Sequence, residues 1–154
     1  MQKTLVILKP DAVKRGITGK IIERLESKGL KLVASKMQLL DESILKEHYS
    51  HLATKPFFPS IVEYMTSAPV ILQIWEGVYS CEVVRLMLGA TNARTALPGT
   101  IRGDFAMSIS KNTMHASESL EAANIEISRF FKQEEVFSYV RSDEEQVYDK
   151  DDLR

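Results

Sequence analysis

The segment TLVILKPDAVKRGITGKIIERLESKGLKLVASKMQL, residues 4–39, decides the fold of this chain. It opens with a β-branched and aliphatic run, Thr4–Leu8, that stops at Lys9-Pro10-Asp11, as a central strand ending in a functional loop does. A helical pattern follows and ends at Gly29, a residue type that commonly terminates helices. Residues 30–39 then have the composition of a second strand. The segment therefore predicts a strand, a helix and a strand in succession.

The remaining chain continues this alternation as far as residue 131. We expect helices at residues 41–50, 60–66, 80–88 and 119–131, and strands at residues 69–75 and 105–109. The last strand is predicted because Phe105, Met107 and Ile109 alternate with small residues. This order contains the split βαβ pattern and predicts an α+β ferredoxin-like sandwich, a four-stranded antiparallel sheet with helices packed on one face. Residues 132–154 are expected to form an acidic tail over the surface or on a neighbouring subunit.

Length and composition predict one globular domain, residues 1–154, because 154 residues at 44% hydrophobic content bury one ordinary core. The net charge of −1 does not favour nucleic acid or an anionic membrane as a partner. The single Cys81 lies in a helical pattern and is expected to be a buried structural thiol, which fits a reducing compartment. No apolar run approaches the roughly 18 residues of a membrane helix, and the first residues do not resemble a signal peptide. We therefore expect a cytoplasmic protein.

The stretch PGTIRGDFAMSISKNTMHAS, residues 98–117, carries the strongest chemical signal. Arg102 supplies a forked cation for phosphate oxygens, Asn112 supplies amide donors, and His115 can exchange a proton or attack an electrophile near neutral pH. An irregular segment, residues 89–104, precedes it, and long irregular segments in compact domains are commonly functional. The chain has neither a Walker loop nor a Rossmann turn, so side chains would have to hold any phosphate.

Seven segments, in order and in register, resemble nucleoside diphosphate kinases. They are KPDAVKRG (residues 9–16), HYSHL (48–52), KPFF (55–58), WEG (75–77), LGATN (88–92), PGTIRGDF (98–105) and NTMHASES (112–119). The resemblance extends from Thr4 to about Phe131 and leaves only the acidic tail outside it.

This resemblance implies ping-pong transfer of the terminal phosphate from a nucleoside triphosphate to a nucleoside diphosphate. His115 matches the nucleophile that becomes phosphohistidine, and Glu126 matches the glutamate that holds the other ring nitrogen. Tyr49 and Ser117 match groups close to this pair, whereas His48 has no role that we assign from the sequence.

The resemblance also implies the nucleotide-binding residues. Matching positions are Arg85, Thr91 and Arg102 at the phosphates, Lys9 and Asn112 at the ribose and a phosphate oxygen, and Phe57 beneath the base. Magnesium is implied as an ion bound with the nucleotide, because the chain shows no carboxylate cage that would make a metal site of its own.

Two alternatives and three departures from the family pattern accompany this reading. One is a ferredoxin-like module that senses nucleotides without turnover, and the other is a nucleic-acid-binding protein, which would need a more basic surface.

The departures from the family pattern are at residues 93, 116 and 118. Ala116 stands where glycine is common and would be strained at a positive φ, and Glu118 stands where aspartate is usual. Ala93 replaces a proline found in many hexameric members. We still expect a homo-oligomer, a hexamer in preference to a tetramer.

Overall fold

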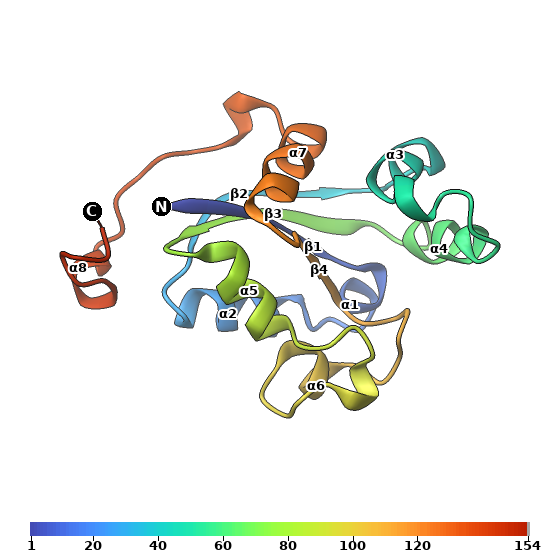
Figure 1. Cartoon of the computed structure of the whole chain (residues 1–154), viewed down its shortest axis with the longest axis horizontal. Coiled ribbons are helices and arrows are strands. Elements are labelled where there is room, and N and C mark those ends of the chain that lie inside the picture. Colours follow the sequence, from blue (N-terminus) through green and yellow to red (C-terminus); the bar gives the residue numbers. More distant parts are fainter. Residues whose placement is uncertain (154) are drawn as a thin grey trace.

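A four-stranded antiparallel sheet forms the centre of the molecule (Figure 1). The computed structural model describes residues 1–153. The strands are β1 (Gln2–Leu8), β2 (Lys31–Gln38), β3 (Val70–Gly77) and β4 (Met114–Ala116). They lie in the order β2-β3-β1-β4, and each neighbouring pair is antiparallel. This order is that of a ferredoxin-like sandwich, so the predicted fold class is confirmed.

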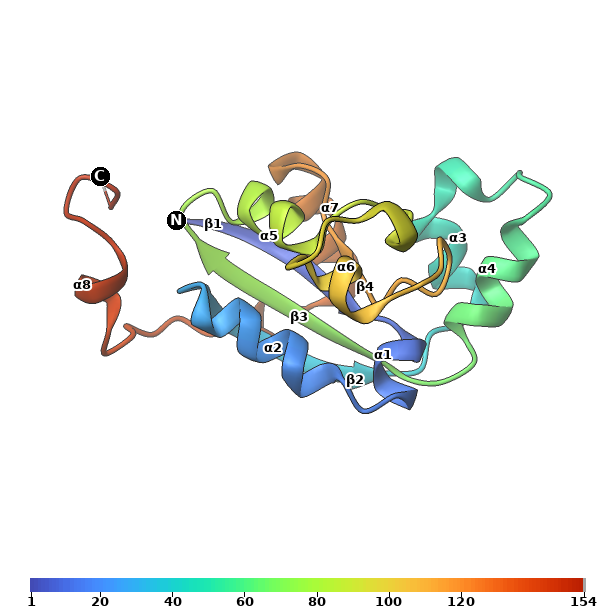
Figure 2. The ribbon, with the colours of Figure 1, turned by 90° about the horizontal axis from the view of Figure 1, so that it is seen from below.

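Helices cover both faces of this sheet. They are α1 (Pro10–Lys14), α2 (Thr18–Ser27), α3 (Glu42–His48), α4 (Phe58–Met65), α5 (Ser80–Leu88), α6 (Ile101–Phe105), α7 (Leu120–Phe130) and α8 (Glu144–Val147). Figures 1 and 2 show α2 and α5 on one side of the sheet and α7 on the other. The prediction that the helices lie on one face is therefore wrong. Among residues 1–153 no helix is both long and apolar enough to cross a membrane.

The central strand β1 explains why both faces are covered. Leu5 and Ile7 belong to a core cluster that includes residues of α3, α4 and α7, whereas Val6 and Leu8 belong to one that includes residues of α2, α5 and α6. All four side chains are fully buried. Consecutive apolar residues are typical of a strand covered on both sides, because successive side chains point to opposite faces.

The predicted strand at residues 105–109 is wrong. Phe105 ends α6, and the side chains of Met107 and Ile109 are 78% and 55% exposed, so their alternation does not mark a buried face. The fourth strand is instead β4, which pairs with the end of β1 and places His115 opposite Ile7. Ala116 lies in this strand with extended backbone and a buried side chain, so the strain expected of a methyl group at positive φ does not arise.

Two segments expected to be loops contain short helices. Pro10 opens α1 at the first helical position, where its missing N–H group costs nothing, so the loop predicted after β1 is a helical turn. Residues 89–104 hold a 3₁₀ turn at Ala93–Thr95 and most of α6. Gly89 ends α5 with φ of 83° and ψ of −178°, a conformation that suits glycine. This bend turns the chain from α5 toward the segment that carries Arg102.

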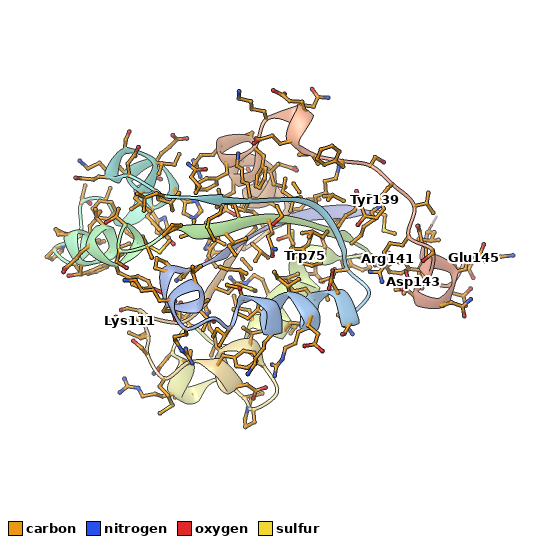
Figure 3. The ribbon with its side chains drawn as sticks, turned by 180° about the vertical axis from the view of Figure 1, so that it is seen from behind. Trp75, Lys111, Tyr139, Arg141, Asp143 and Glu145 are labelled. Atoms are coloured by element: carbon orange, nitrogen blue, oxygen red, sulfur yellow. The ribbon has the colours of Figure 1, made fainter. Side chains whose placement is uncertain are left out.

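The tail, residues 132–153, follows the outer edge of β2 on its own chain. The backbone N–H of Phe137 donates to the carbonyl of Val33 (2.8 Å), and Nη1 of Arg141 donates to the carbonyl of Leu30 (2.7 Å). Figure 3 shows Arg141 beside the turn between α2 and β2, with α8 beyond it. The tail thus occupies carbonyl groups at the start of an edge strand.

Candidate active site

His115 in β4 and Glu126 in α7 form the centre of the site. Nε2 of His115 lies 3.1 Å from Oε1 of Glu126. The hydroxyl of Ser117, two residues further along the chain, donates to Oε2 of the same carboxylate at 2.5 Å. This hydroxyl also accepts from the backbone N–H of Leu5 in β1 (3.2 Å), which fixes its position. The sheet and α7 together bring the three predicted residues into one hydrogen-bonded group.

Two aromatic side chains at the end of α3 lie against this group. The ring of His48 is 4.7 Å from the ring of His115 between centroids, and the ring of Tyr49 is 6.4 Å from it. Tyr49 was predicted from the sequence, whereas His48 was given no role. The sequence feature that could have indicated a role for His48 was its place next to Tyr49 in the HYSHL segment. Only the packing of α3 shows that the His48 ring contacts the ring of His115.

Arg102 organises the backbone around β4. Its Nε, Nη1 and Nη2 atoms donate to the carbonyls of Asn112 (3.3 Å), Gly89 (3.2 Å) and Met114 (3.0 Å), respectively. The residue is 6% exposed. A guanidinium carries five N–H donors, so two remain after these bonds. Arg102 therefore combines a structural task with capacity for an anion.

Lys9 and Asn112 make the second hydrogen-bonded group. Nζ of Lys9, at the end of β1, donates to Oδ1 of Asn112 at 2.7 Å. The amide nitrogen of Asn112 donates to the carbonyls of Thr91 (3.1 Å) and Ile109 (2.8 Å). Asn112 is 2% exposed, and it therefore joins the end of β1 to the segments on both sides of α6.

A strained turn at Thr113 connects this second group to β4. Thr113 has φ of 70°, and the N–H of Met114 donates to the carbonyl of Asn112 (2.8 Å), which is the pattern of a γ-turn. Left-handed backbone is rare for a β-branched residue. The N–H of Thr113 donates to Oδ2 of Asp11 (3.1 Å), and its carbonyl accepts from the N–H of Lys9 (2.8 Å). Strain of this kind persists where neighbouring groups hold it, often at functional sites.

The side chains of three predicted residues lie at the surface, away from the hydrogen bonds of these two groups. Arg85 is exposed on α5, and its charge acts on Arg102, so these two cations are neighbours. Thr91 is exposed and contributes its carbonyl to Asn112. Phe57 precedes α4 with its side chain 52% exposed. Among the described contacts, none joins Phe57 to His115.

The protonation states around β4 favour an anionic ligand. Burial, followed by the charge of Arg102, lowers the pKa of Lys9 to about 8, and burial, followed by the charge of Arg85, lowers the pKa of Arg102 to about 10. Both side chains are still mainly cationic at pH 7. Burial and the nearby charge of Glu126 raise the pKa of the Tyr49 hydroxyl, so it stays neutral.

Glu126 remains ionised for a different reason. Burial alone would raise the pKa of its carboxyl group, but the hydrogen bond and charge of His115, with the hydrogen bond of Ser117, lower it overall. An ionised Glu126 accepts a hydrogen bond from Nε2–H of His115, so the ring proton lies on Nε2 and Nδ1 carries a free electron pair.

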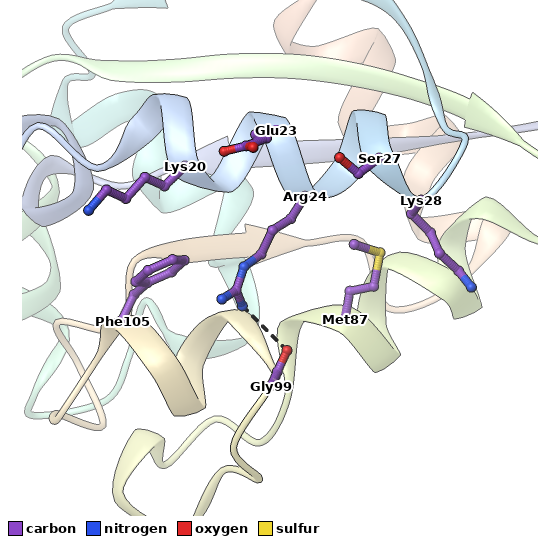
Figure 4. A pocket seen from close by; sticks show the side chains of 8 residues that line it. All are labelled: Lys20, Glu23, Arg24, Ser27, Lys28, Met87, Gly99 and Phe105. Carbon is purple, nitrogen blue, oxygen red and sulfur yellow. Dashed lines mark hydrogen bonds between the residues drawn. The ribbon is translucent and has the colours of Figure 1, made fainter. Parts of the chain in front are cut away.

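A cavity of about 640 Å³ lies apart from these groups, between α2 and residues 99–105 (Figure 4). Arg24 of α2 crosses it, donating to the carbonyl of Gly99 (3.3 Å), pairing with Asp104 (2.5 Å) and lying 4.4 Å over the ring of Phe105. None of the predicted site residues lines this cavity. We therefore infer that the contacts of Arg24 hold the segment that carries Arg102 in place, and we assign no nucleotide to this cavity.

The ligand atoms of His48, His115 and Glu126 lie within 4.8 Å of one another, close enough to be considered as a metal site. The His115–Glu126 hydrogen bond already uses two of these groups, and Nη1 of Arg129 lies 3.4 Å from Nδ1 of His48. A permanent positive charge at this point opposes a cation. We assign no metal to these residues.

The geometry combines a ring nitrogen that is free to attack with a nearby group of cations. A neutral imidazole held by a carboxylate is a competent nucleophile, and fixed N–H donors stabilise charge that develops on a transferred group. This arrangement suits transfer of a phosphoryl group better than proton transfer alone.

Comparisons with known proteins agree with this chemistry. The family model described as nucleoside diphosphate kinase matches residues 2–136. A nucleoside diphosphate kinase of Parabacteroides distasonis is 55% identical over 139 residues, which cover 90% of this chain and 91% of that protein. One of Pyrococcus horikoshii is 51% identical over 144 residues, 92% of each chain.

Solved structures give the same result. A nucleoside diphosphate kinase of Halobacterium salinarum in complex with CDP matches with a TM-score of 0.93 at 42% identity, covering 96% of this chain and 99% of that one. A transition-state mimic of the Borrelia burgdorferi enzyme with vanadate and ADP matches with a TM-score of 0.88 at 41% identity, covering 94% and 95%. The chain therefore belongs to the nucleoside diphosphate kinase family, whose members move the terminal phosphate of a nucleoside triphosphate to a nucleoside diphosphate.

Proposed function

We propose that His115 is the nucleophile of this reaction and carries the phosphate as phosphohistidine. The observation that supports this role is the 3.1 Å contact of Nε2 with Glu126, which leaves Nδ1 free. Nδ1 attacks the terminal phosphorus, the N–P bond forms, and the bond to the bridging oxygen breaks as the nucleoside diphosphate leaves. A terminal oxygen of the acceptor diphosphate then attacks the same phosphorus. The N–P bond breaks, and its electron pair returns to Nδ1.

Glu126, Ser117 and Tyr49 support this step in our proposal. The carboxylate of Glu126 holds the ring tautomer and stabilises the positive charge that the ring gains on attack. Ser117 holds the second carboxylate oxygen at 2.5 Å and so orients the first. The neutral hydroxyl of Tyr49 lies at the edge of the same group and can donate to a transferred phosphate.

The nucleotide is held by residues around β4 and on the loops beside it. We propose that Arg85, Thr91 and the free N–H groups of Arg102 bind the phosphates. Lys9 and Asn112 bind the ribose hydroxyls and a phosphate oxygen, and their 2.7 Å contact supports this pairing. Phe57 stacks on the base, which suits its exposed ring and a broad base range, because every base presents a π-face.

We propose that Mg²⁺ arrives with the phosphates of the nucleotide. The carboxylates described beside His115 and Thr113 are engaged, since Glu126 accepts from His115 and Ser117, and Asp11 accepts from Thr113 and Tyr64. The donor set that remains is cationic or neutral and suits phosphate oxygens better than a metal ion.

We propose that the chain is a single catalytic domain, residues 1–154, that acts in the cytoplasm as a homo-oligomer, a hexamer in preference to a tetramer. Exposed apolar side chains at Leu97, Met107 and Ile109 cluster in sequence around α6 and support association of copies. The free, buried thiol of Cys81 supports a reducing compartment. The acidic tail lies on β2 of its own chain and is available to meet a neighbouring subunit.

Labelling of the whole protein tests the proposed intermediate. Incubation with a nucleoside triphosphate labelled in its terminal phosphate is expected to place an acid-labile, alkali-stable phosphate on His115, identified by peptide mapping. Addition of a nucleoside diphosphate should remove the label and form labelled triphosphate. A wild-type protein that takes up no label, or takes it up on another residue, would overturn the proposal.

The variant Glu126→Gln is expected to slow phosphohistidine formation by about 10-fold. The amide oxygen can still accept from Nε2 of His115, but the negative charge that stabilises the charged ring is lost, and such a change is worth about 1 to 2 kcal/mol. Single-turnover labelling measures the rate. Glu121→Gln, which removes an exposed carboxylate from the same helix, is the matched control and should label at the wild-type rate. Equal rates for Glu126→Gln and the control would contradict the role of the carboxylate.

A further inference from the structure

A buried histidine lies directly behind the proposed nucleophile. The side chain of His48 is 1% exposed, and its ring packs edge-on against the rings of His115, Tyr49 and Phe130 at centroid distances of 4.7, 4.6 and 5.2 Å. Its Nε2 atom has no hydrogen-bond partner among the described residues. A buried polar atom without a partner is costly, so the site tolerates it for a reason connected with the opposite ring nitrogen.

The opposite nitrogen, Nδ1, faces Arg129 of α7. Nη1 of Arg129 lies 3.4 Å from Nδ1, and Nε of the same guanidinium donates to Oε1 of Glu47 at 2.8 Å. A guanidinium offers only N–H donors and stays charged at every physiological pH. Nδ1 must therefore accept, and the ring proton of His48 must reside on Nε2, where no partner stands. The contact with Arg129 thus accounts for the unpartnered atom.

The tautomer of His48 matters because Glu126 is close to the same nitrogen. Nδ1 of His48 lies 3.9 Å from Oε1 of Glu126, the oxygen that Nε2 of His115 contacts at 3.1 Å. If Nδ1 of His48 carried a proton, it would be a second donor aimed at this oxygen. It would then compete with His115 for the group that holds the nucleophile in its reactive tautomer.

We propose that Arg129 is a positioning residue, which keeps Nδ1 of His48 an acceptor and so reserves Oε1 of Glu126 for His115. This inference rests on the proposed role of His115 and deepens it. Arg129 acts through His48 and Glu126, and Glu47, which accepts from its Nε, holds it in place.

The titratable and charged groups that face His48 come from four parts of the fold. They are His115 on β4, Glu126 and Arg129 on α7, Lys9 at the end of β1, and Tyr49, which follows α3 and is neutral. Burial, then His115, lowers the pKa of His48; Glu126 raises it, and Arg129 and Lys9 lower it further, to about 3. Because this pKa lies below the ordinary value of 6.5, His48 stays neutral as the pH falls toward 5. Removal of Arg129 should raise this pKa by about 1 unit, which leaves His48 mainly neutral above pH 5, so the variant should change the tautomer of the ring and not its charge.

The test compares Arg129→Leu with the wild-type enzyme by two readouts. In ¹⁵N NMR of histidine-labelled protein near pH 7, wild-type His48 should show its proton on Nε2 only, whereas Arg129→Leu should show a fraction of the ring with its proton on Nδ1. In single-turnover labelling at the same pH, phosphohistidine formation in Arg129→Leu should be slower by about 3-fold or more, because Nδ1–H of His48 then competes with Nε2–H of His115 for Oε1 of Glu126.

Three further variants separate this effect from a general loosening of α3 against α7. Arg129→Lys keeps a charged donor and should retain the wild-type tautomer and labelling rate in large part. Glu47→Gln removes the ion pair between the helices, leaves an amide oxygen for Arg129, and should keep the wild-type tautomer and rate. The double variant Arg129→Leu/His48→Phe should label at the same rate as His48→Phe alone, because the ring that competes for Glu126 is gone.

The outcomes distinguish this inference from the proposed function. A wild-type enzyme without phosphohistidine would overturn the role of His115, and the NMR spectra would still decide the tautomer of His48. A labelled wild type, together with an unchanged His48 tautomer and an unchanged labelling rate in Arg129→Leu, would overturn the inference alone. A rate loss in Glu47→Gln equal to that in Arg129→Leu would also overturn it, since the effect would then come from the ion pair between helices.

Discussion

The variant His115→Ala is expected to lose phosphotransfer between nucleoside triphosphate and diphosphate by at least about 10⁴-fold, because removal of a covalent nucleophile removes the reaction path itself. The same variant should take up no labelled phosphate. Its unfolding transition should stay close to that of the wild type, because the side chain is partly exposed, at 18%, and a small residue such as alanine, like the neighbouring Ala116, fits this strand.

Nucleotide binding separates this enzyme mechanism from a module that only senses nucleotides. His115→Ala keeps Lys9, Arg102 and Asn112 in place, so equilibrium binding of a nucleoside diphosphate should change by less than about 3-fold, measured by calorimetry. Transfer rates in the coupled assay should meanwhile fall to the background of the assay. A variant that retains a substantial fraction of wild-type transfer would rule out His115 as the carrier of the phosphate.

The variant Arg102→Leu is expected to lower the free energy of unfolding by about 2 kcal/mol or more. It leaves the carbonyls of Gly89 and Met114 without the side-chain donor described for them, whereas the carbonyl of Asn112 keeps the N–H of Met114 and the hydroxyl of Thr113, and each acceptor left unpaired costs about 1 kcal/mol or more. Urea denaturation followed by the fluorescence of Trp75, a fully buried tryptophan of β3, measures the loss. Arg102→Lys should recover little of it, because one ammonium group cannot reach three carbonyls in different directions.

Activity should fall by about 10²- to 10³-fold in Arg102→Leu at a temperature where the variant is folded. The change removes a fixed donor that we propose for the transferred phosphate, and donors of this kind contribute about that factor. Arg94→Leu is the matched control, since Arg94 is an exposed arginine of the same loop and its described hydrogen bond comes from the backbone. Arg102→Leu with control-like stability and transfer rate would refute both roles of the guanidinium.

The strand pattern shows where sequence reading works for this fold. Three of the four strands were predicted, since β1, β2 and β3 are long runs with apolar residues buried against the core. β4 was missed because three residues are too few to show a period, and its position depends on pairing with β1. The alternation at Phe105, Met107 and Ile109 resembled a strand, but the side chains of Met107 and Ile109 are exposed to solvent. A period-two pattern indicates a strand only where the chain has another strand beside it.

The site shows the same division. The family resemblance predicted a site that contains His115, Glu126 and Arg102, although these residues come from different elements. Their resemblance carried no information on Arg129, because its contact with His48 depends on how α7 lies against the end of α3. His48 itself was visible in the sequence, yet its burial and its distance to His115 were not.

The amino-acid sequence by itself determined three of the four strands, the family and the residue types of the proposed site, because these follow from local patterns and from segments in register. Only the tertiary structure decided that helices cover both sheet faces, that His115 lies inside β4, and which ring nitrogen of His115 is free. These features depend on contacts between residues far apart in the chain, such as Leu5 with Ser117 and His48 with Arg129. Contacts of this kind form only when the whole chain packs, so the residues near either partner in the sequence do not reveal them.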